Sequence, residues 1–446
     1  MTKHKSRERR RRTSADNHHI MVKPPNNLAM ATKDETEEEE EKLMEFDLNL
    51  NNFSILHTIA LRAHSRVRQV TYLKEENEVD IGRKYQLKVM EKSFLVENDG
   101  KKAEHFKHEM EIQRLLYKNQ WLPRLYGIWD DELRIYMLNE YIQGTDLFLA
   151  MREKGKLHVD EARFYLCQVM EILDVLHSSD IIHRDIKPDN FLVKLDGNLM
   201  LGDLSLAKVV SERTFTVCGT PEYVAPDVFN GLGYAKLADY WSMGVLLYEM
   251  IAGHVPFQGN TIYAIYDAIQ RGSLDMTNKA IFKDPVKGLL NKLLERNRSS
   301  RIGAKRGLEE IRAHSYFKGI QWSAVRALQM APPWPKTFIR PLEPGICDME
   351  CYPEPILDMS IPIDSENQKM LREVVHPVND EILKEQERIK RELERKRKRR
   401  EEREKRKKME GESAEFVPAV KSIEENLESK LDDISISNDS VSTLGL

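Results

Sequence analysis

Six polar or ionisable side chains stand close together in the segment IIHRDIKPDNFLV, residues 181–193. They lie between two apolar stretches, IIH and FLV, which have the composition of short buried strands. A carboxylate or ammonium group near a hydrophobic core costs free energy unless it is paired, bound to a ligand or used in chemistry. We therefore predict a functional loop between two strands at the core edge. Its polar residues are His183, Arg184, Asp185, Lys187, Asp189 and Asn190.

The elements that must position this loop follow two different patterns. VRQVTYL and KYQLKVM, early in the chain, alternate apolar and polar residues as strands do. ARFYLCQVMEILDVLH and ADYWSMGVLLYEMIAG, further on, have apolar residues at helical spacing. These patterns predict an α+β fold for residues 53–317, with a small β-rich lobe over about 53–141 and a larger helical lobe over about 142–317.

Composition excludes several classes of protein. The 446 residues carry a formal net charge of −4, which predicts no particular partner. No apolar run approaches the ~18 residues of a membrane span, and the N-terminus is charged, unlike a signal peptide. The few scattered cysteines fit neither a disulfide framework nor a zinc site, so we expect free thiols in a reducing compartment. We expect an intracellular protein, in the cytoplasm or also in the nucleus. The cysteines are Cys167, Cys218, Cys347 and Cys351.

Further motifs accompany the loop in a fixed order. They are Lys88 in KYQLKVM, Glu111 in HEMEIQRLL, Asp203 in LGDLSLAK, the segment CGTPEY, Ala225-Pro226-Asp227, Asp239-Tyr240-Trp241 with Gly244, and Arg301. With His183-Arg184-Asp185, and Asn190 five residues after the aspartate, this series resembles the eukaryotic protein kinase domain over residues 53–317. The segments RTFTVCGTPEYVAPD and APPWPKTFIRP resemble the AGC group, near the cyclic-nucleotide-dependent kinases. The resemblance implies the bilobal kinase fold.

The resemblance also implies ATP and Mg²⁺ as cofactors and gives the loop residues their roles. Asp185 orients or accepts the proton of the substrate hydroxyl, for which it must lie within about 3 Å of that oxygen. Lys187 steadies the transferring phosphate. Asn190 and Asp203 offer oxygen ligands to Mg²⁺. Phosphoryl transfer needs positioning and charge neutralisation more than covalent chemistry, and these residue types supply both.

Lys88 holds the α and β phosphates in the family, and a glutamate on the following helix fixes its position. We expect Glu111 in that role because Ile112 and Leu115 then lie on the buried helix face. Glu109 is the alternative. An ordinary surface ion pair is the competing interpretation for each of these charged groups.

The activation segment resembles that of serine/threonine kinases. The lysine two residues after Asp185, together with Thr220, is typical of that branch. Arg184 matches the position that binds an activation-loop phosphate in the family, with Lys208 as a second cation. Thr216 is the expected phosphorylated residue, and Thr214 is the alternative.

Three aspartates match positions at which arginine-directed AGC kinases hold basic residues upstream of the phosphorylated residue. They are Asp146, Asp189 and Asp267. Glu222 is a fourth candidate for substrate binding, in the segment that forms a peptide-docking shelf in the family. We expect a preference for Arg-x-x or Arg-Arg-x before Ser or Thr. Ordinary surface acids remain the alternative interpretation.

The nucleotide site departs from the family pattern. The segment ALRAHSRV, residues 60–67, stands where a glycine-rich loop is expected, and it contains no glycine. Side-chain donors there either replace the usual backbone N–H groups or occupy the phosphate space. Gln86 replaces a small alanine, Asn139 is a polar gatekeeper, and Asp203 is followed by Leu204-Ser205 instead of Phe-Gly. The positions matched to the nucleotide pocket are Ala60, Arg62, His64, Val67, Gln86, Asn139, Glu140, Ile142 and Leu192.

Three functions fit these observations to different degrees. A serine/threonine protein kinase is favoured, because all five charged or amide groups of the catalytic set are present and a scaffold has no chemical use for them. A pseudokinase scaffold with weak or no ATP turnover is the alternative, since the glycines are lost. A small-molecule kinase is disfavoured by the segment GTPEYVAPD.

The flanking segments predict tails rather than further domains. Residues 1–45, basic and then acidic, cannot bury apolar area and are expected to be disordered, as are residues 411–446. Residues 318–358 resemble a partial AGC-type extension, without a clear Phe-x-x-Phe motif. Residues 379–410 predict an exposed charged helix that is either a solvated spacer or a basic patch for nuclear import or a polyanion. We expect substrates with basic motifs, a regulatory subunit as a candidate partner, no nucleic acid, and a monomeric kinase domain.

Overall fold

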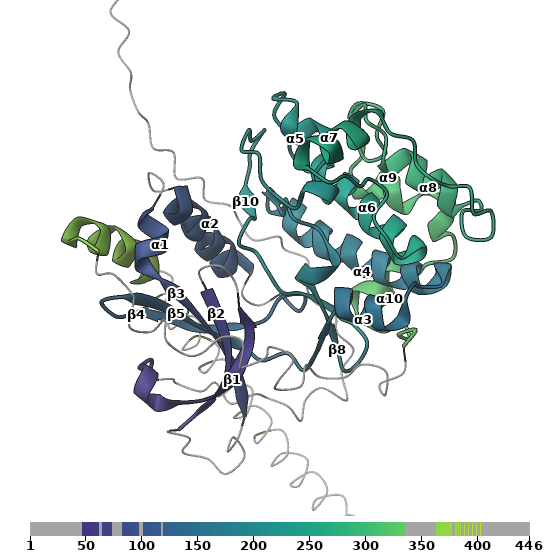
Figure 1. Ribbon diagram of the computed structural model, residues 1–446. Helices are drawn as coiled ribbons and strands as arrows, with labels where there is room; N and C mark the ends of the chain where they lie inside the picture. Colours follow the sequence, from purple (N-terminus) through teal and green to yellow (C-terminus); the bar gives the residue numbers. More distant parts are fainter. Residues whose placement is uncertain are drawn as a thin grey trace, which may run out of the picture.

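The computed structural model describes residues 47–61, 65–73, 83–97, 101–116, 119–334 and 363–376, with single positions between 380 and 402. A smaller lobe built on a β-sheet adjoins a larger, mainly helical lobe (Figure 1). This confirms the predicted α+β class. Both expected tails, 1–45 and 411–446, lie outside the described residues, as do Arg62 and His64. Within the described ranges, no helix has the length and apolar character needed to cross a membrane.

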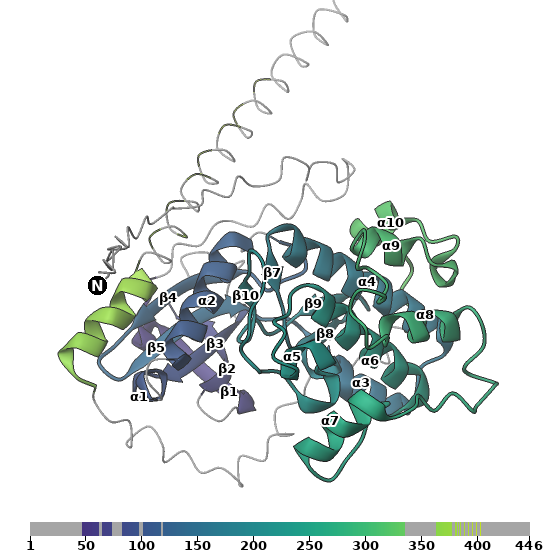
Figure 2. The same cartoon turned by 90° about the horizontal axis from the view of Figure 1, so that it is seen from above.

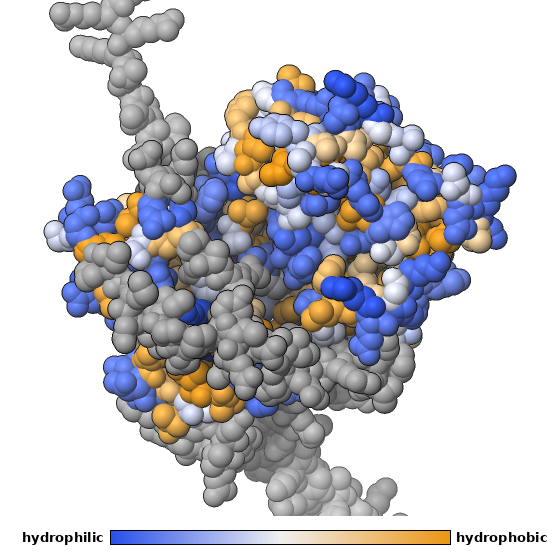
Figure 3. All heavy atoms as spheres, in the orientation of Figure 1, coloured by the Kyte–Doolittle hydropathy of each residue, from blue (hydrophilic) through white to orange (hydrophobic). Residues whose placement is uncertain are grey.

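The small lobe is a five-stranded antiparallel sheet in the order β1-β2-β3-β5-β4. Its strands are β1 (Phe53–Leu61), β2 (Ser65–Tyr72), β3 (Lys84–Glu91), β4 (Leu125–Asp130) and β5 (Arg134–Glu140). The alternation predicted for KYQLKVM is present from Lys84 to Lys88, since Tyr85 and Leu87 are buried and Gln86 between them is partly exposed. Hydrophobic residues gather over the outer strand β1 (Figure 3), on which Ile55 and Leu56 are exposed.

The register of the sheet places the side chains of one cavity wall opposite one another. Val67 of β2 lies opposite Lys88 of β3, and Gln86 of β3 lies opposite Asn139 of β5. Because alternate residues of a strand point to the same face, all four share the face that borders the cavity described below. Asn139 Nδ2 donates to the carbonyl oxygen of Met137 at 3.5 Å.

Two helices pack on this same face of the small-lobe sheet, where their apolar side chains cluster with Met90 and Met137. They are α1 (Lys92–Val96) and α2 (Lys101–Leu116). Phe106 and Met110 of α2 are buried in the small-lobe cluster, at the spacing of one helix face. Glu109 is buried beside them, whereas Leu115 is 46% exposed. Ile112 is buried as predicted, whereas Leu115 is not, so the predicted buried face of α2 is only partly right.

The large lobe packs its core around two long helices, α4 and α6, which contact each other. Trp241 and Met243 of α6 are fully buried. The helix ends where Gly253 adopts φ 84° and its N–H donates to the Glu249 carbonyl, a left-handed cap that favours glycine. The helices are α3 (Leu147–Lys154), α4 (Val159–Ser178), α5 (Pro226–Phe229), α6 (Leu237–Ala252), α7 (Ile262–Arg271), α8 (Val286–Leu293), α9 (Leu308–Arg312) and α10 (Trp322–Arg326).

The predicted strand–loop–strand arrangement of residues 181–193 is confirmed. IIH forms β7 (Ile181–Ile182), which pairs with β10 (Lys208–Val209). FLV lies in β8 (Phe191–Lys194), the middle strand of a sheet with β6 (Gly144–Asp146) and β9 (Leu199–Leu201). The short helix η2 (Pro188–Asn190) closes the loop between them. Both strands are anchored in the core, so the polar residues between them are held at its edge.

A helix over residues 365–376 packs on the small lobe, beside α1 (Figure 2). The sequence predicted a charged helix only from residue 379. The structure therefore adds a helical segment before it, in which Leu371 and Val375 are fully buried. Described positions from Asp380 to Glu402 are also helical.

Candidate active site

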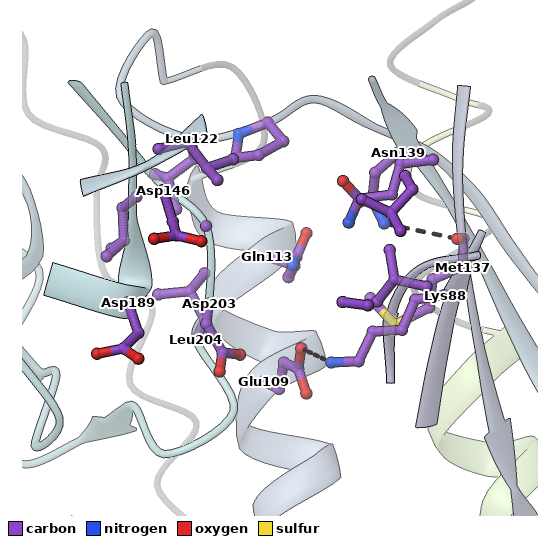
Figure 4. Close-up of a pocket in the computed structure, with 18 of the residues that line it drawn as sticks. Lys88, Glu109, Gln113, Leu122, Met137, Asn139, Asp146, Asp189, Asp203 and Leu204 are labelled. Carbon is purple, nitrogen blue, oxygen red and sulfur yellow. Dashed lines mark hydrogen bonds and ion pairs between the residues drawn. The ribbon is translucent and has the colours of Figure 1, made fainter. Parts of the chain in front are cut away.

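A cavity of about 320 Å³ lies between the two lobes. Its small-lobe wall comes from β1, β2, β3, β5 and α2, and its large-lobe wall from β8, β9 and the segment that follows β9. Figure 4 shows Asp146, Asp189 and Asp203 on the side opposite Lys88 and Asn139. Several carboxylates thus face an ammonium group across a partly apolar space, an arrangement suited to a charged ligand.

Lys88 makes its ion pair with Glu109, not with the expected Glu111. Lys88 Nζ lies 2.6 Å from Glu109 Oε1, and both side chains are largely buried. The side chain of Glu111 is 41% exposed and lies near His108 on the outer face of α2. The prediction of Glu111 was wrong because residues two apart on a helix lie about 200° apart, and the helix packs through Phe106, Glu109 and Met110.

Replacing each glutamate separately tests this correction. We expect Glu109→Gln to lower kcat/KM for phosphate transfer about 10- to 100-fold, since hydrogen bonds to charged groups contribute roughly 1.5–3 kcal/mol. Glu111→Gln is the matched control, on the same helix and with the same change, and should leave kcat/KM within about twofold. Equal losses in the two variants would contradict the assignment.

Asp185 is held in one orientation by four groups. Its Oδ1 accepts hydrogen bonds from Thr220 N at 2.9 Å and Thr220 Oγ1 at 2.7 Å. Its Oδ2 accepts from Asn190 Nδ2 at 3.0 Å and lies 3.2 Å from Lys187 Nζ. Burial would raise the pKa of Asp185, but the Thr220 hydrogen bond and the charge of Lys187 outweigh burial and lower it. The loop thus supplies an oriented, ionised carboxylate.

The lowered pKa of Asp185 has a consequence for stability. A carboxyl group whose folded pKa lies below its ordinary value of 3.8 stabilises the fold above that pH, and this contribution is lost as pH falls through the folded pKa. We expect the difference in unfolding free energy between wild type and Asp185→Asn to shrink between about pH 6 and about pH 3. Urea denaturation at both values measures it, and a constant difference would count against an ionised, hydrogen-bonded Asp185.

Asp239 supports the loop from beneath, a role that was not predicted for this motif residue. Its carboxylate accepts hydrogen bonds from the backbone N–H groups of His183 and Arg184, both at 2.9 Å. It also contacts His177 Nε2 at 2.8 Å. Arg184 has φ 71°, a conformation unfavourable for a residue with a side chain. The fully buried Asp239 therefore stabilises a strained loop backbone.

Asp203 follows β9 and is oriented by its neighbours. Ser205 donates from its N–H to Asp203 Oδ1 at 3.1 Å and from its hydroxyl to Oδ2 at 3.2 Å. The carbonyl oxygen of Asp203 lies 2.9 Å from His183 Nε2. Leu204 is buried in the core of the large lobe. Ser205, at the position of the family glycine, thus holds the Asp203 carboxylate through two hydrogen bonds, where a glycine would leave the backbone flexible.

The nucleotide-pocket positions predicted from the sequence are only partly brought together. Glu140 and Ile142 are not among the described residues that line the cavity, and Glu140 Oε2 instead accepts from Arg124 N at 3.2 Å. Met137 lines the cavity and was missed, although alternation places it on the same face of β5 as Asn139. The predicted positions that do line it are Ala60, Val67, Gln86, Lys88, Asn139 and Leu192.

The activation-segment residues differ in exposure. Thr214 is buried and pairs with Tyr234 through the backbone, whereas Thr216 is exposed. Arg184 Nε donates to the Leu206 carbonyl at 2.6 Å. Its other two nitrogens are buried with no acceptor within hydrogen-bond distance in the described part of the chain. An unsatisfied buried guanidinium is costly and favours an added anion.

Lys208 lies in β10, which contacts α2. Burial lowers the pKa of His108 on α2, and the positive charge of Lys208 lowers it further. Lys208 therefore places positive charge near α2, and its role as a second cation for an activation-loop phosphate stays a prediction.

The four acidic candidates for substrate binding lie in different environments. Asp146 and Asp189 both border the cavity, and the pKa of Asp146 is raised by burial and then by the charge of Asp189. Asp267 lies on α7, 59% exposed, and pairs with Arg271 at 3.0 Å. Glu222 lies on the short helix η3 (Pro221–Tyr223), which contacts α7. The structure thus brings Asp146 and Asp189 together and leaves Asp267 apart from the cavity.

Comparison with known families decides what this arrangement is. The sequence model of the protein kinase domain matches residues 71–317. The chain belongs to the protein kinase family. The match falls within the range 53–317 that resembled this domain, so the recognition from motifs is confirmed.

The relatives of this protein kinase include catalytic subunits of cAMP-dependent protein kinases. The human subunit PRKX is 32% identical over 328 residues, covering 73% of this chain and 87% of the relative. Type 3 from Saccharomyces cerevisiae is 33% identical over 310 residues, covering 69% and 74%. Catalytic subunit 3 from Drosophila melanogaster is 36% identical over 235 residues, covering 52% of this chain and 40% of the relative. The AGC resemblance is thereby confirmed.

The residues of the cavity fit the nucleotide and divalent metal that protein kinases use. Lys88 Nζ has three donors, of which the Glu109 bond occupies one, so two remain for phosphate oxygens. Asp203 and Asn190 provide carboxylate and amide oxygens, which suit a hard divalent cation. The cavity volume lies in the range of sites for small ligands.

Proposed function

We propose that this protein kinase transfers the γ-phosphate of ATP to serine or threonine hydroxyls of proteins, with Mg²⁺ as the metal. The observation that carries the proposal is the environment of Asp185, an oriented carboxylate with a lowered pKa beside Lys187 and Thr220. A pure binding protein has no use for such a group, since burying a carboxylate costs free energy. Lys187 and Thr220, which contact each other at 2.8 Å, are typical of the serine/threonine branch.

The residues divide the chemistry between them. Asp185 takes the proton of the substrate hydroxyl. The hydroxyl oxygen then bonds to the γ-phosphorus while the bond between that phosphorus and the ADP oxygen breaks. Lys187 lies next to that carboxylate and places positive charge where the transferring group passes. Lys88 holds phosphate oxygens, and Asn190 and Asp203 hold Mg²⁺, which neutralises phosphate charge when bound.

Arginine upstream of the phosphorylated residue is part of the proposal. Asp146 and Asp189 are close enough to affect each other electrostatically, and both border the cavity. Two neighbouring carboxylates repel, so a guanidinium between them is favoured. Relatives of this chain are named catalytic subunits, which supports a regulatory subunit as a partner. An intracellular location is also part of the proposal.

A nucleotide-binding scaffold is the second candidate, favoured by two substitutions at the cavity. Gln86 lines it where the family has alanine, and Ser205 fastens Asp203 where the family has glycine. The longer side chain of Gln86 takes up space in the cavity, and the hydrogen bonds from Ser205 restrict the movement of Asp203. In this alternative, nucleotide binds and stabilises the fold, but no phosphate is transferred.

One experiment separates the two candidates and tests the substrate preference. Transfer of labelled γ-phosphate to an Arg-Arg-x-Ser peptide with Mg²⁺ is compared with transfer to the same peptide lacking arginine, and thermal stabilisation by ATP is measured in parallel. We expect transfer only to the basic peptide. Thermal stabilisation by ATP without phosphate transfer supports the scaffold. If ATP gives neither transfer nor stabilisation, both candidates are left without support.

Substituting the acids tests the origin of the preference. Asp146→Asn removes the charge and keeps the cap of α3, since asparagine caps helices well. We expect KM for the basic peptide to rise about tenfold in Asp146→Asn and in Asp189→Asn, as charged pairs contribute roughly 1.5–3 kcal/mol. Asp267→Asn is the matched control, because that acid is exposed and already paired with Arg271. Unchanged KM in the first two variants would remove the arginine preference.

A further inference from the structure

Three carboxamide side chains line the cavity from three different elements. They are Gln86 of β3, Gln113 of α2 and Asn139 of β5, called here the carboxamide cluster. Gln86 lies opposite Asn139 in the sheet, and Gln113 stands one helical turn after Glu109, on the same face of α2. None of the three takes part in the proposed phosphate transfer, so their presence needs another explanation.

The carboxamide cluster lies next to the ion pair of Lys88 and Glu109, one step further along each element. Gln86 is on the same face of β3 as Lys88, about 7 Å along the strand. Gln113 is about 6 Å from Glu109 along the axis of α2. Figure 4 shows Gln113 and Asn139 on the same side of the Lys88–Glu109 pair. The cavity therefore has a charged region and, beside it, a region of neutral amides.

The carboxamide cluster has hydrogen-bonding capacity that the fold does not use. A carboxamide has two N–H donors and an oxygen that accepts two hydrogen bonds. Asn139 is only 5% exposed, and its one hydrogen bond, to the Met137 carbonyl, is long at 3.5 Å. In the part of the chain that the structure describes, neither Gln86 nor Gln113 makes a side-chain hydrogen bond. Buried polar groups without partners are costly, so a ligand that pairs with them is favoured.

A nucleotide bound in the cavity brings its base to the carboxamide cluster. In the proposed function, Lys88 and Asp203 bind the phosphates and the metal, so the phosphates occupy the charged region. On the far side of Lys88, the next residues on the same strand faces are Met90 of β3 and Ile135 of β5, and both are buried and not among the described residues that line the cavity. The base therefore extends the other way, towards Gln86 and Asn139.

A carboxamide can recognise two kinds of purine. Adenine presents a 6-amino donor beside the N1 acceptor, whereas guanine and hypoxanthine present a 6-oxo acceptor beside the N1–H donor. An asparagine side chain pairs with the first set of groups in one orientation of its amide, and with the second set after a half-turn of the amide. The long bond to Met137 restrains Asn139 only weakly, so this half-turn costs little.

We propose that Asn139 recognises the 6-position of the base, and that the kinase accepts 6-oxo purine nucleoside triphosphates such as GTP and ITP as well as ATP. Gln86 and Gln113 complete the polar surface around that amide. The inference rests on the proposed function, which places the phosphates at Lys88. An apolar side chain at position 139 could pair with neither kind of base.

Three nucleotides that differ only at the N1–C6 edge of the base test the proposal. They are ATP, ITP and purine riboside triphosphate, which has no 6-substituent. Titration calorimetry with Mg²⁺ measures Kd for each, and transfer to the Arg-Arg-x-Ser peptide measures kcat/KM. In the wild type we expect ITP to bind within about fivefold of ATP. Purine riboside triphosphate should bind at least about tenfold more weakly than ATP, because the buried carboxamide is then left partly unpaired.

Asn139→Leu shows whether this amide is the recognising group. The substitution nearly keeps the size of the side chain and removes its hydrogen-bonding groups. We expect ATP and ITP to bind about tenfold more weakly, and purine riboside triphosphate as in the wild type, so that the three Kd values converge. Asn51→Leu is the matched control, the same change at an exposed side chain of the small lobe, and should leave all three Kd values unchanged.

The outcomes separate this inference from the proposed function. Phosphate transfer from ATP, with ITP bound more than about tenfold more weakly than ATP, overturns the inference and leaves the proposed function standing. Purine riboside triphosphate bound as tightly as ATP also overturns it, because the 6-position is then not recognised. Similar Kd values for ATP and ITP without transfer from either overturn the proposed function only, and binding of none of the three overturns both. The comparison in the wild type decides if Asn139→Leu does not fold.

Discussion

Asp185→Asn is expected to lower kcat for phosphate transfer roughly 10²- to 10⁴-fold, the range contributed by a positioned general base. The amide cannot take the substrate proton. Its Nδ2, in place of Oδ2, would also meet the donor groups of Asn190 and Lys187, so the orientation itself is disturbed. Transfer to the Arg-Arg-x-Ser peptide in a single-turnover assay measures the chemical step.

Two controls show whether the loss is specific. Asp196→Asn makes the same change at a half-exposed turn carboxylate near the end of β8 and should leave kcat unchanged. Nucleotide-induced thermal stabilisation should persist in Asp185→Asn, because Asp185 does not line the described cavity. A variant that keeps a kcat within about threefold of wild type would show that Asp185 is not the base.

Asp227→Ala is expected to lower the free energy of unfolding by about 3–5 kcal/mol, the cost of breaking a buried ion pair from one side. Arg301 NH1 lies 2.6 Å from Asp227 Oδ2, and the arginine side chain is 0% exposed. Its other partners are backbone carbonyls, those of Glu295 at 2.8 Å, Leu237 at 3.0 Å and Arg296 at 3.4 Å. These carry only partial charge and cannot replace the carboxylate.

Urea denaturation followed by intrinsic fluorescence measures this loss, with Trp241 lying over the Arg301 guanidinium at 5.2 Å. Asp267→Ala is the control, since it breaks the exposed pair with Arg271 and should cost about 0–1 kcal/mol. The sequence resemblance places glutamate at position 227 in the family. Asp227→Glu keeps the charge and should recover most of the stability, and equal losses in the alanine and glutamate variants would show that packing rather than charge matters.

The family and the fold could be predicted from the sequence, because the residues that carry them are close neighbours. His183-Arg184-Asp185 and Asn190 lie within one loop, and flanking apolar triplets are enough to predict the strands that hold it. Alternation likewise predicted the strand β3, and the family resemblance assigned its Gln86 and Lys88 to the nucleotide pocket. In these cases the spacing along the chain determines how the side chains lie, because a strand alternates its faces every residue and a short loop keeps its residues close together.

Contacts between distant segments were decided only by the tertiary structure. The sequence favoured Glu111 over Glu109 as the partner of Lys88, whereas the actual choice depends on which face of α2 packs on the sheet. The helix at 365–376 has an apolar pair that could have faced solvent, a second chain or this lobe. Its place is set by the burial of this apolar pair and by the contacts of Gln368 with Lys92 and of Arg372 with Asp130, which no local pattern predicts. The rotation of a helix and the partner of its buried face are properties of the packed core, because they depend on side chains that meet only after the chain has folded.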